Sequence, residues 1–186
     1  MGRRHRTEAE VLRQARRLFI SKGYAGASVR HIADAAGVSV GTVASMGGKD
    51  ALFLRCMEEL ATASALTALE AQSDPDRALR DFVRATPGLT EAGTQLSRDY
   101  LRALLQVGPE TGGAAHREAV VARLTLCWSQ VLGLEPDAPE AAARAHAFYA
   151  CLIGCVFAVV TGQLDRADAI KVVEGLLPAP APQGSR

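Results

Sequence analysis

The sequence has few of the features that mark secreted, membrane or cofactor-carrying proteins. Its 186 residues include four cysteines, which show neither the spacing of a disulfide framework nor a CxxC metal pair. No apolar signal segment opens the chain, and its most apolar stretch, residues 147–160, is shorter than the roughly 20 residues that span a bilayer. We therefore expect a cytoplasmic protein with no membrane partner, no bound metal and no cofactor.

Patterns typical of catalysis are also missing. The four histidines are scattered, and no Glu-x-x-His pair is present of the kind that holds a di-iron centre in a helical bundle. The sequence contains neither a nucleophile motif nor a phosphate-binding loop. These absences predict that the chain is not an enzyme.

Charge is distributed unevenly along the chain, although the net charge is only +1. Residues 1–49 contain nine basic and three acidic side chains, a net charge of +6, whereas the remainder has a net charge of −5. Ordinary solvated surface charge would explain this asymmetry about as well if it were the only signal. A basic head on an acidic body favours a polyanionic partner for the head.

Apolar residues recur at helical spacing throughout, and no segment alternates convincingly enough to be a strand. We predict an all-α fold of about nine helices, in which a three-helix N-terminal head precedes a larger C-terminal helical bundle. Residues 1–48 are expected to form a basic arm and the three-helix head, 49–177 the larger helical domain, and 178–186 a disordered tail. The helices are expected at about 7–21, 28–36, 39–45, 49–71, 75–86, 91–106, 114–132, 139–161 and 167–177.

The stretch VRHIADAAGVSVGTVASM, residues 29–46, predicts a helix-turn-helix. Gly37 stands where the tight turn needs a positive backbone angle, and Ala33 is small where two helices must approach closely. Ser28 and Ser39 are suited to cap the two helices. Five apolar residues fall at positions that face a small core: Ile32, Ala36, Val38, Val43 and Met46.

The sequence around this motif resembles the N-terminal signature of TetR-type regulators. The resemblance rests on RQARRLF at 13–19, GY at 23–24, SVRHIA at 28–33, AGVSVGTV at 36–43 and KDALF at 49–53. It implies a ligand-responsive transcriptional regulator, most often a repressor, that binds a palindromic operator as a homodimer. The resemblance also implies that a small molecule, which we expect to be largely apolar, releases the protein from DNA.

One position departs from the family pattern. Such regulators usually have a phosphate-binding tyrosine at the end of the third helix, where this chain has Ala44. The segment from Ser45 to Lys49 is also one residue shorter than usual. Lys49 is therefore the expected phosphate contact at this end of the motif.

The predicted third helix presents only small side chains to DNA. None of them can form the bidentate contacts that Arg makes with guanine or Asn with adenine. Specificity is then expected to depend on single hydrogen bonds, thymine methyl contacts, DNA shape and an arginine arm in the minor groove. The expected DNA-binding residues are Arg3, Arg4, Ser28, Arg30, Ser39, Val40, Thr42, Ala44, Ser45 and Lys49.

The helix expected over 139–161 is apolar on every side beyond residue 147, apart from Tyr149 and the cysteines, so every side needs a cover. One side can pack on its own domain and another on a second copy of the chain, in a four-helix interface with the last helix. The alternative is a central core helix in a monomer. The expected interface residues are Ala150, Gly154, Phe157, Ile170, Val173 and Leu177.

Six of the nine aromatic residues follow Pro75, which suits an apolar ligand cavity with a few orienting polar groups. Ordinary core packing explains any single one of them better than a ligand-binding role does. The candidate ligand-binding residues are Phe82, Tyr100, Trp128, His146 and Tyr149.

Two alternative functions remain open from the residues alone. The chain can be a DNA-binding protein with no effector, which effector-dependent release from DNA would exclude. It can also be a redox-sensing regulator that uses Cys151 and Cys155, which lie one helical turn apart. Buried cysteines, however, usually act as small inert apolar groups.

Overall fold

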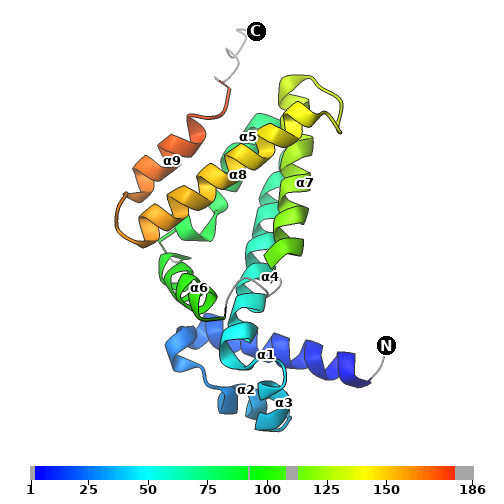
Figure 1. The fold of residues 1–186 in the computed structure, drawn as a ribbon, viewed down its shortest axis with the longest axis vertical. Helices are drawn as coiled ribbons and strands as arrows, with labels where there is room; N and C mark the ends of the chain where they lie inside the picture. Colours follow the sequence, from blue (N-terminus) through cyan, green and yellow to red (C-terminus); the bar gives the residue numbers. More distant parts are fainter. Residues whose placement is uncertain (1–2, 92, 108–112, 179–186) are drawn as a thin grey trace. The chain divides into compact units, whose positions relative to one another are not determined.

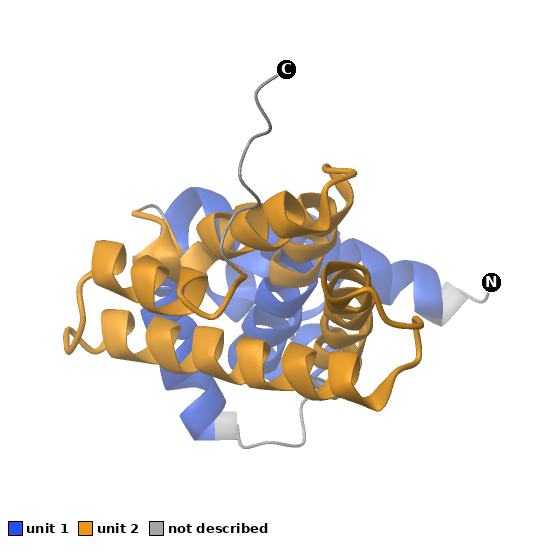
Figure 2. Cartoon of the chain, turned by 90° about the horizontal axis from the view of Figure 1, so that it is seen from above, with its two compact units in different colours: residues 1–60, 95–114 blue, residues 61–94, 115–186 orange. Residues whose placement is uncertain are grey.

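The computed structural model describes residues 3–91, 93–107 and 113–178, and these residues form helices, turns and loops without any strand. The all-α prediction is therefore confirmed. The chain divides into two compact units, residues 1–60 with 95–114 and residues 61–94 with 115–186 (Figure 2). Because α4 contributes to both units, the domain boundary expected at residue 48 stays a prediction.

Unit 1 contains the N-terminal helices, which can be followed from blue to cyan in Figure 1. They are α1 (Arg3–Gly26), α2 (Val29–Ala36), α3 (Val40–Ala44) and the first part of α4 (Gly48–Glu70). Helix α6 (Gly93–Val107) joins them from later in the sequence. These bounds agree with the predicted second to fourth helices to within a few residues.

The beginning of α1 differs from the prediction. Arg3–Arg6 were expected to form an extended arm, but they are the first residues of α1, while Met1 and Gly2 lie outside the described residues. Extending an existing helix is easier than nucleating a new one, and arginine has a high helix propensity. Thr7, where the first helix was expected to begin, consequently lies inside α1.

Gly23 interrupts α1 near its end, as expected from the sequence. Its φ of 69° and ψ of 175° are not helical, and the chain forms one more turn before Gly26. Glycine reaches this positive φ without the clash that a Cβ atom would cause.

The core of unit 1 is built around an aromatic cluster. Phe19 and Phe53 meet edge to face with ring centroids 4.9 Å apart, and Tyr24 lies 4.8 Å from Phe53. Leu52, Phe53, Leu54 and Cys56 are fully buried in α4, so the start of this helix is covered by its neighbours on several sides.

Unit 2 contains the rest of α4 with α5 (Pro75–Ala85), the 3₁₀ turn η1 (Pro87–Leu89), α7 (Gly113–Leu132), α8 (Pro139–Val160) and α9 (Arg166–Glu174). Helix α9 turns back along α8 and also packs on α5 (Figure 1). The buried residues of this unit form one apolar cluster. The predicted tail beyond Pro178 lies outside the described residues.

Leu54 and Leu105 provide a matched test of the unit 1 core. Leu54 is fully buried in α4, whereas Leu105 is 87% exposed on α6. Leu54→Ala removes buried methyl groups and leaves a cavity, so we expect it to lower the free energy of unfolding by about 2–5 kcal/mol.

Leu105→Ala should change the free energy of unfolding by less than about 0.5 kcal/mol, because its side chain is already in water. Urea unfolding of both variants measures the difference. Equal effects of the two substitutions would show that the start of α4 does not form the core described above.

Candidate nucleic-acid interface

Helices α2 and α3 have the capped ends that the sequence predicts. Ser28 Oγ accepts a hydrogen bond from the backbone N–H of His31 at 3.1 Å, and Ser39 Oγ accepts one from Thr42 at 3.0 Å. Gly37 ends α2 with φ 65° and ψ 34°, and its N–H donates to the carbonyls of Ala33 and Asp34. These contacts define a tight turn between two short helices.

The apolar residues of this segment face inward as predicted. Ile32 and Val43 are fully buried and Ala33 nearly so. Ala36, Val38 and Met46 are partly buried against the same cluster. The packing orients the opposite side of α3 outward.

That outward side carries small side chains. Val40 is 49% exposed, Ser39, Gly41, Ala44 and Ser45 are also exposed, and Thr42 is half-buried. The hydroxyls already bond locally, since Ser39 Oγ lies 2.9 Å from Thr42 Oγ1 and Ser45 Oγ donates to the Thr42 carbonyl at 2.8 Å. The face therefore presents a methyl-rich surface with few free donors.

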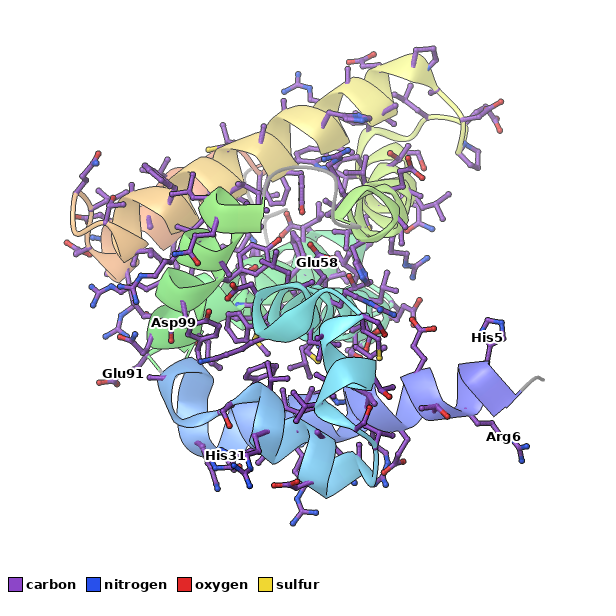
Figure 3. All side chains as sticks on the ribbon, turned by 60° about the horizontal axis from the view of Figure 1, so that its bottom comes forward. His5, Arg6, His31, Glu58, Glu91 and Asp99 are labelled. Carbon is purple, nitrogen blue, oxygen red and sulfur yellow. The ribbon has the colours of Figure 1, made fainter. Side chains whose placement is uncertain are left out.

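Basic side chains are exposed on the neighbouring helices α1 and α2 of unit 1. Arg30 of α2 is exposed, as are Arg16 and Arg17 of α1. His5 and Arg6 project from the free end of α1, and His31 projects from α2 (Figure 3). The side chains of Arg3 and Arg4 lie outside the described residues.

Lys49 is held in place by an aromatic ring. Its Nζ lies 3.9 Å from the centroid of the Tyr24 ring, and the Tyr24 hydroxyl donates a hydrogen bond to Asp50. Burial of the phenol, together with the Asp50 carboxylate, raises the pKa of Tyr24 to about 12. The tyrosine is thus uncharged near neutral pH and fixes the ammonium group at the start of α4.

This geometry matches a known DNA-binding family. The family model described as "Bacterial regulatory proteins, tetR family" matches residues 11–56, which include α2, α3 and most of α1. Residues 11–56 thus carry the DNA-binding domain of the TetR family. The match covers the helix-turn-helix and the start of α4, and comparison with curated proteins finds no further relative.

Solved structures extend the likeness in fold to the rest of the chain. FadR of Thermus thermophilus, in complex with lauroyl-CoA, is 20% identical with a TM-score of 0.67 over 95% of this chain and 99% of that one. The multidrug binding protein EbrR, complexed with imidazole, is 25% identical with a TM-score of 0.60 over 98% and 96%. PfmR, a TetR-family regulator also from Thermus thermophilus, is 24% identical with a TM-score of 0.54 over 90% and 96%.

The candidate ligand-binding residues fall in three different environments. Phe82 and Trp128 are buried in the unit 2 cluster on either side of Phe148, with ring centroids 6.4 Å and 5.7 Å from it. Tyr149 packs partly buried against the same cluster. The structure therefore brings these three together.

The other two candidates lie elsewhere. Tyr100 belongs to unit 1, where its hydroxyl donates to Glu58 at 3.2 Å. His146 is exposed on α8, with its Nδ1 atom 2.8 Å from the Ala142 carbonyl oxygen. The sequence alone does not distinguish Tyr100 and His146 from the aromatic residues of the unit 2 core, because all of them lie on helices with similar apolar patterns.

The expected interface residues also divide. Ala150, Gly154 and Phe157 lie on an exposed side of α8, where Phe157 is 50% exposed. Ile170 is half-buried, and Val173 and Leu177 are buried in the core of their own unit rather than open to a partner. The exposed apolar residues here are instead Val172 of α9 and Leu176, which follows the helix, because α9 packs on α8 and α5 through its other side.

Cys56, Cys127 and Cys155 are in environments that favour the thiol. Burial raises the pKa of Cys155, and the adjacent Cys151 raises it further. Burial also raises the pKa of Cys56, to about 12, and that of Cys127. A raised pKa lowers the fraction of the reactive thiolate, which disfavours redox chemistry at these positions.

Sequence reasoning missed a set of polar residues within unit 1. Glu58 and Asp99 are buried acids on α4 and α6, and Asp99 lies 3.9 Å from Arg102. Their neighbours Tyr24 and Asp50 stood in the family signature without an assigned role. No local signal marks Glu58 or Asp99, since their burial depends on α6 packing against helices far away in the sequence.

Lys49→Gln tests the proposed phosphate contact at the start of α4. Removing one phosphate-binding charge should weaken binding to any duplex and reduce the slope of log K against log salt by about one. Fluorescence anisotropy with a labelled duplex at several salt concentrations measures both quantities.

Lys171→Gln is the matched control, because Lys171 lies in unit 2, 75% exposed and paired with Asp168. It should leave the slope unchanged. Equal slopes for Lys49→Gln and the original protein would mean that the Tyr24 ring, rather than a phosphate, is the partner of Lys49.

Proposed function

We propose that this chain is a ligand-responsive transcriptional repressor of the cytoplasm and not an enzyme. It binds a palindromic operator as a homodimer and leaves it when a small, largely apolar molecule binds unit 2. The observation that carries the proposal is the exposed face of α3, held outward by a capped and tightly turned helix-turn-helix. Repression and ligand binding are typical of the TetR family.

The composition of the α3 face indicates how DNA is read. Val40 and Ala44 offer methyl groups to thymine, and Thr42 and the serines offer single hydrogen bonds. The small side chains let the α3 backbone approach the bases closely. Arg30 and the first turn of α1 supply contacts to the phosphates, and Arg6 reaches from a helix rather than from an extended arm.

The α8 surface supports a dimer. Ala150, Ile153, Gly154 and Phe157 follow the spacing of one helical stripe, and all four are exposed in the single chain. Helix α8 is long and apolar enough to cross a membrane, and length and composition are the only features that point to this. Its opposite side packs into the core of unit 2, so covering by a second copy accounts for both sides.

The structural neighbours support a role for small molecules. Thermus thermophilus FadR is described in complex with lauroyl-CoA and EbrR with imidazole. The buried interior of unit 2 is rich in aromatic and aliphatic side chains, which favours an apolar effector over a strongly charged one.

Selection of duplexes from a random library by the full chain tests DNA recognition. The expected product is an inverted repeat whose half-sites are protected together in footprinting, because a two-fold dimer presents two α3 helices. Enrichment of single half-sites, or of no sequence at all, would contradict the proposed mode of binding.

Gly154→Leu tests the proposed dimer. A Cβ atom added at Gly154 meets no heavy atom within 4 Å in the single chain, so leucine fits there, and it is also a better helix former than glycine. We expect helix content to be kept and the dimer dissociation constant to rise at least about tenfold, since the leucine fills space between two chains.

Sedimentation velocity over a range of concentrations measures the dissociation constant. Ala122→Leu, on an exposed part of α7, is the control and should leave it unchanged. A Gly154→Leu variant as tightly dimeric as the original chain would place the interface elsewhere.

A further inference from the structure

One buried donor of unit 2 has no partner in the structure. Trp128 on α7 is only 2% exposed, and its Nε1 atom makes no hydrogen bond. An indole N–H can only donate, and a buried donor left unpaired loses the hydrogen bond it would make in water. Native proteins rarely leave such a group unsatisfied unless it serves a ligand or a bound water.

The surroundings of this indole are apolar. Phe148 contacts it edge to face, and Phe82, Leu124 and Leu152 belong to the same buried cluster. Ser129 is the other polar side chain buried in the described part of unit 2, and its hydroxyl already donates to the Leu126 carbonyl at 2.9 Å. The cluster therefore contains an unpaired donor, the Trp128 indole N–H, among aromatic and aliphatic side chains.

A second unpaired donor lies on the same helix but on a different side. The Nε atom of Arg123 is buried without a partner. Five residues separate Arg123 from Trp128, which is a rotation of about 140° around the helix. The two side chains therefore leave α7 in different directions.

We propose that Trp128 Nε1 is the donor by which unit 2 recognises its effector, and that the effector is an uncharged, mainly apolar molecule with a carbonyl-type acceptor. This proposal rests on the proposed function. An anionic group would lose its hydration among the apolar side chains of this cluster, whereas a neutral carbonyl exchanges one hydrogen bond with water for one with the indole. The apolar remainder of the molecule would lie against the aromatic walls.

Trp128 is the only tryptophan of the chain, so its indole N–H gives a single resonance in a ¹⁵N-labelled sample of the full protein. The probes are methyl acetate, methyl hexanoate and methyl dodecanoate. Each ester is compared with the unbranched alkane that has the same number of chain atoms. At least one ester is expected to shift the indole resonance downfield and to slow its exchange with solvent, while the matching alkane does neither. Absence of any shift with all three esters, or equal shifts with ester and alkane, would overturn the proposal.

Trp128→Phe provides a second readout, because phenylalanine keeps a ring but removes the donor. Calorimetry should show about tenfold weaker binding of the ester by the variant, and a change of less than twofold for the alkane. Ser129→Ala, which removes a neighbouring hydroxyl with its own partner, should leave ester binding unchanged. Equal losses for ester and alkane in Trp128→Phe would show that the tryptophan only shapes the core.

The two proposals fail in different ways. Release of selected DNA by a molecule that leaves the indole resonance unchanged would keep the repressor function and exclude the Trp128 donor. A shifted indole resonance without any change in DNA affinity would keep the donor site and exclude its role in regulation.

Discussion

Packing around the first half of α4 determines how the DNA-binding helices are held. Leu52, Phe53, Leu54 and Cys56 are fully buried among α1, α2 and α3, and Phe53 meets both Phe19 and Tyr24. A helix of five residues such as α3 has too few backbone hydrogen bonds to be stable in isolation. Its orientation therefore depends on Val43 and on the core that α4 completes.

The same core sets the electrostatics of the nucleic-acid interface. Tyr24 packs against Phe53, directs its hydroxyl to Asp50 and carries the Lys49 ammonium over its ring. The position of the Lys49 ammonium group therefore depends on the apolar packing of Tyr24 against Phe53. Two basic side chains of unit 1 are paired with acids: Arg55 with Glu8 at 2.8 Å and Arg13 with Glu10 at 2.6 Å.

Unit 2 is organised by a different principle. Its core is apolar and its buried aromatic residues gather around Phe148, while α8 leaves a second apolar side exposed. The proposed partner chain would cover the exposed side of α8, and the proposed effector would supply an acceptor for the unpaired indole of Trp128 on α7. Because Phe148 of α8 contacts Trp128 of α7, the proposed dimer surface and the proposed effector site share helix α8.

The sequence by itself determined what depends on local patterns. Ser28, Gly37 and Ser39 fixed the ends of α2 and α3, because capping and a positive φ need only neighbouring residues. Helical spacing likewise identified the inward residues of the helix-turn-helix and the bounds of most helices.

Tertiary structure decided which residues meet across the fold. Only packing with α8 and α5 shows that Val173 and Leu177 face inward while Val172 and Leu176 stay exposed. Helix α6 packs within unit 1, so Tyr100 belongs to a different unit from Phe82 and Trp128. Asp99 of the same helix is buried there. Neither result follows from the spacing of residues along the helix. Helical periodicity gives the relative orientation of residues on one helix, but the direction of the core depends on contacts between helices distant in sequence.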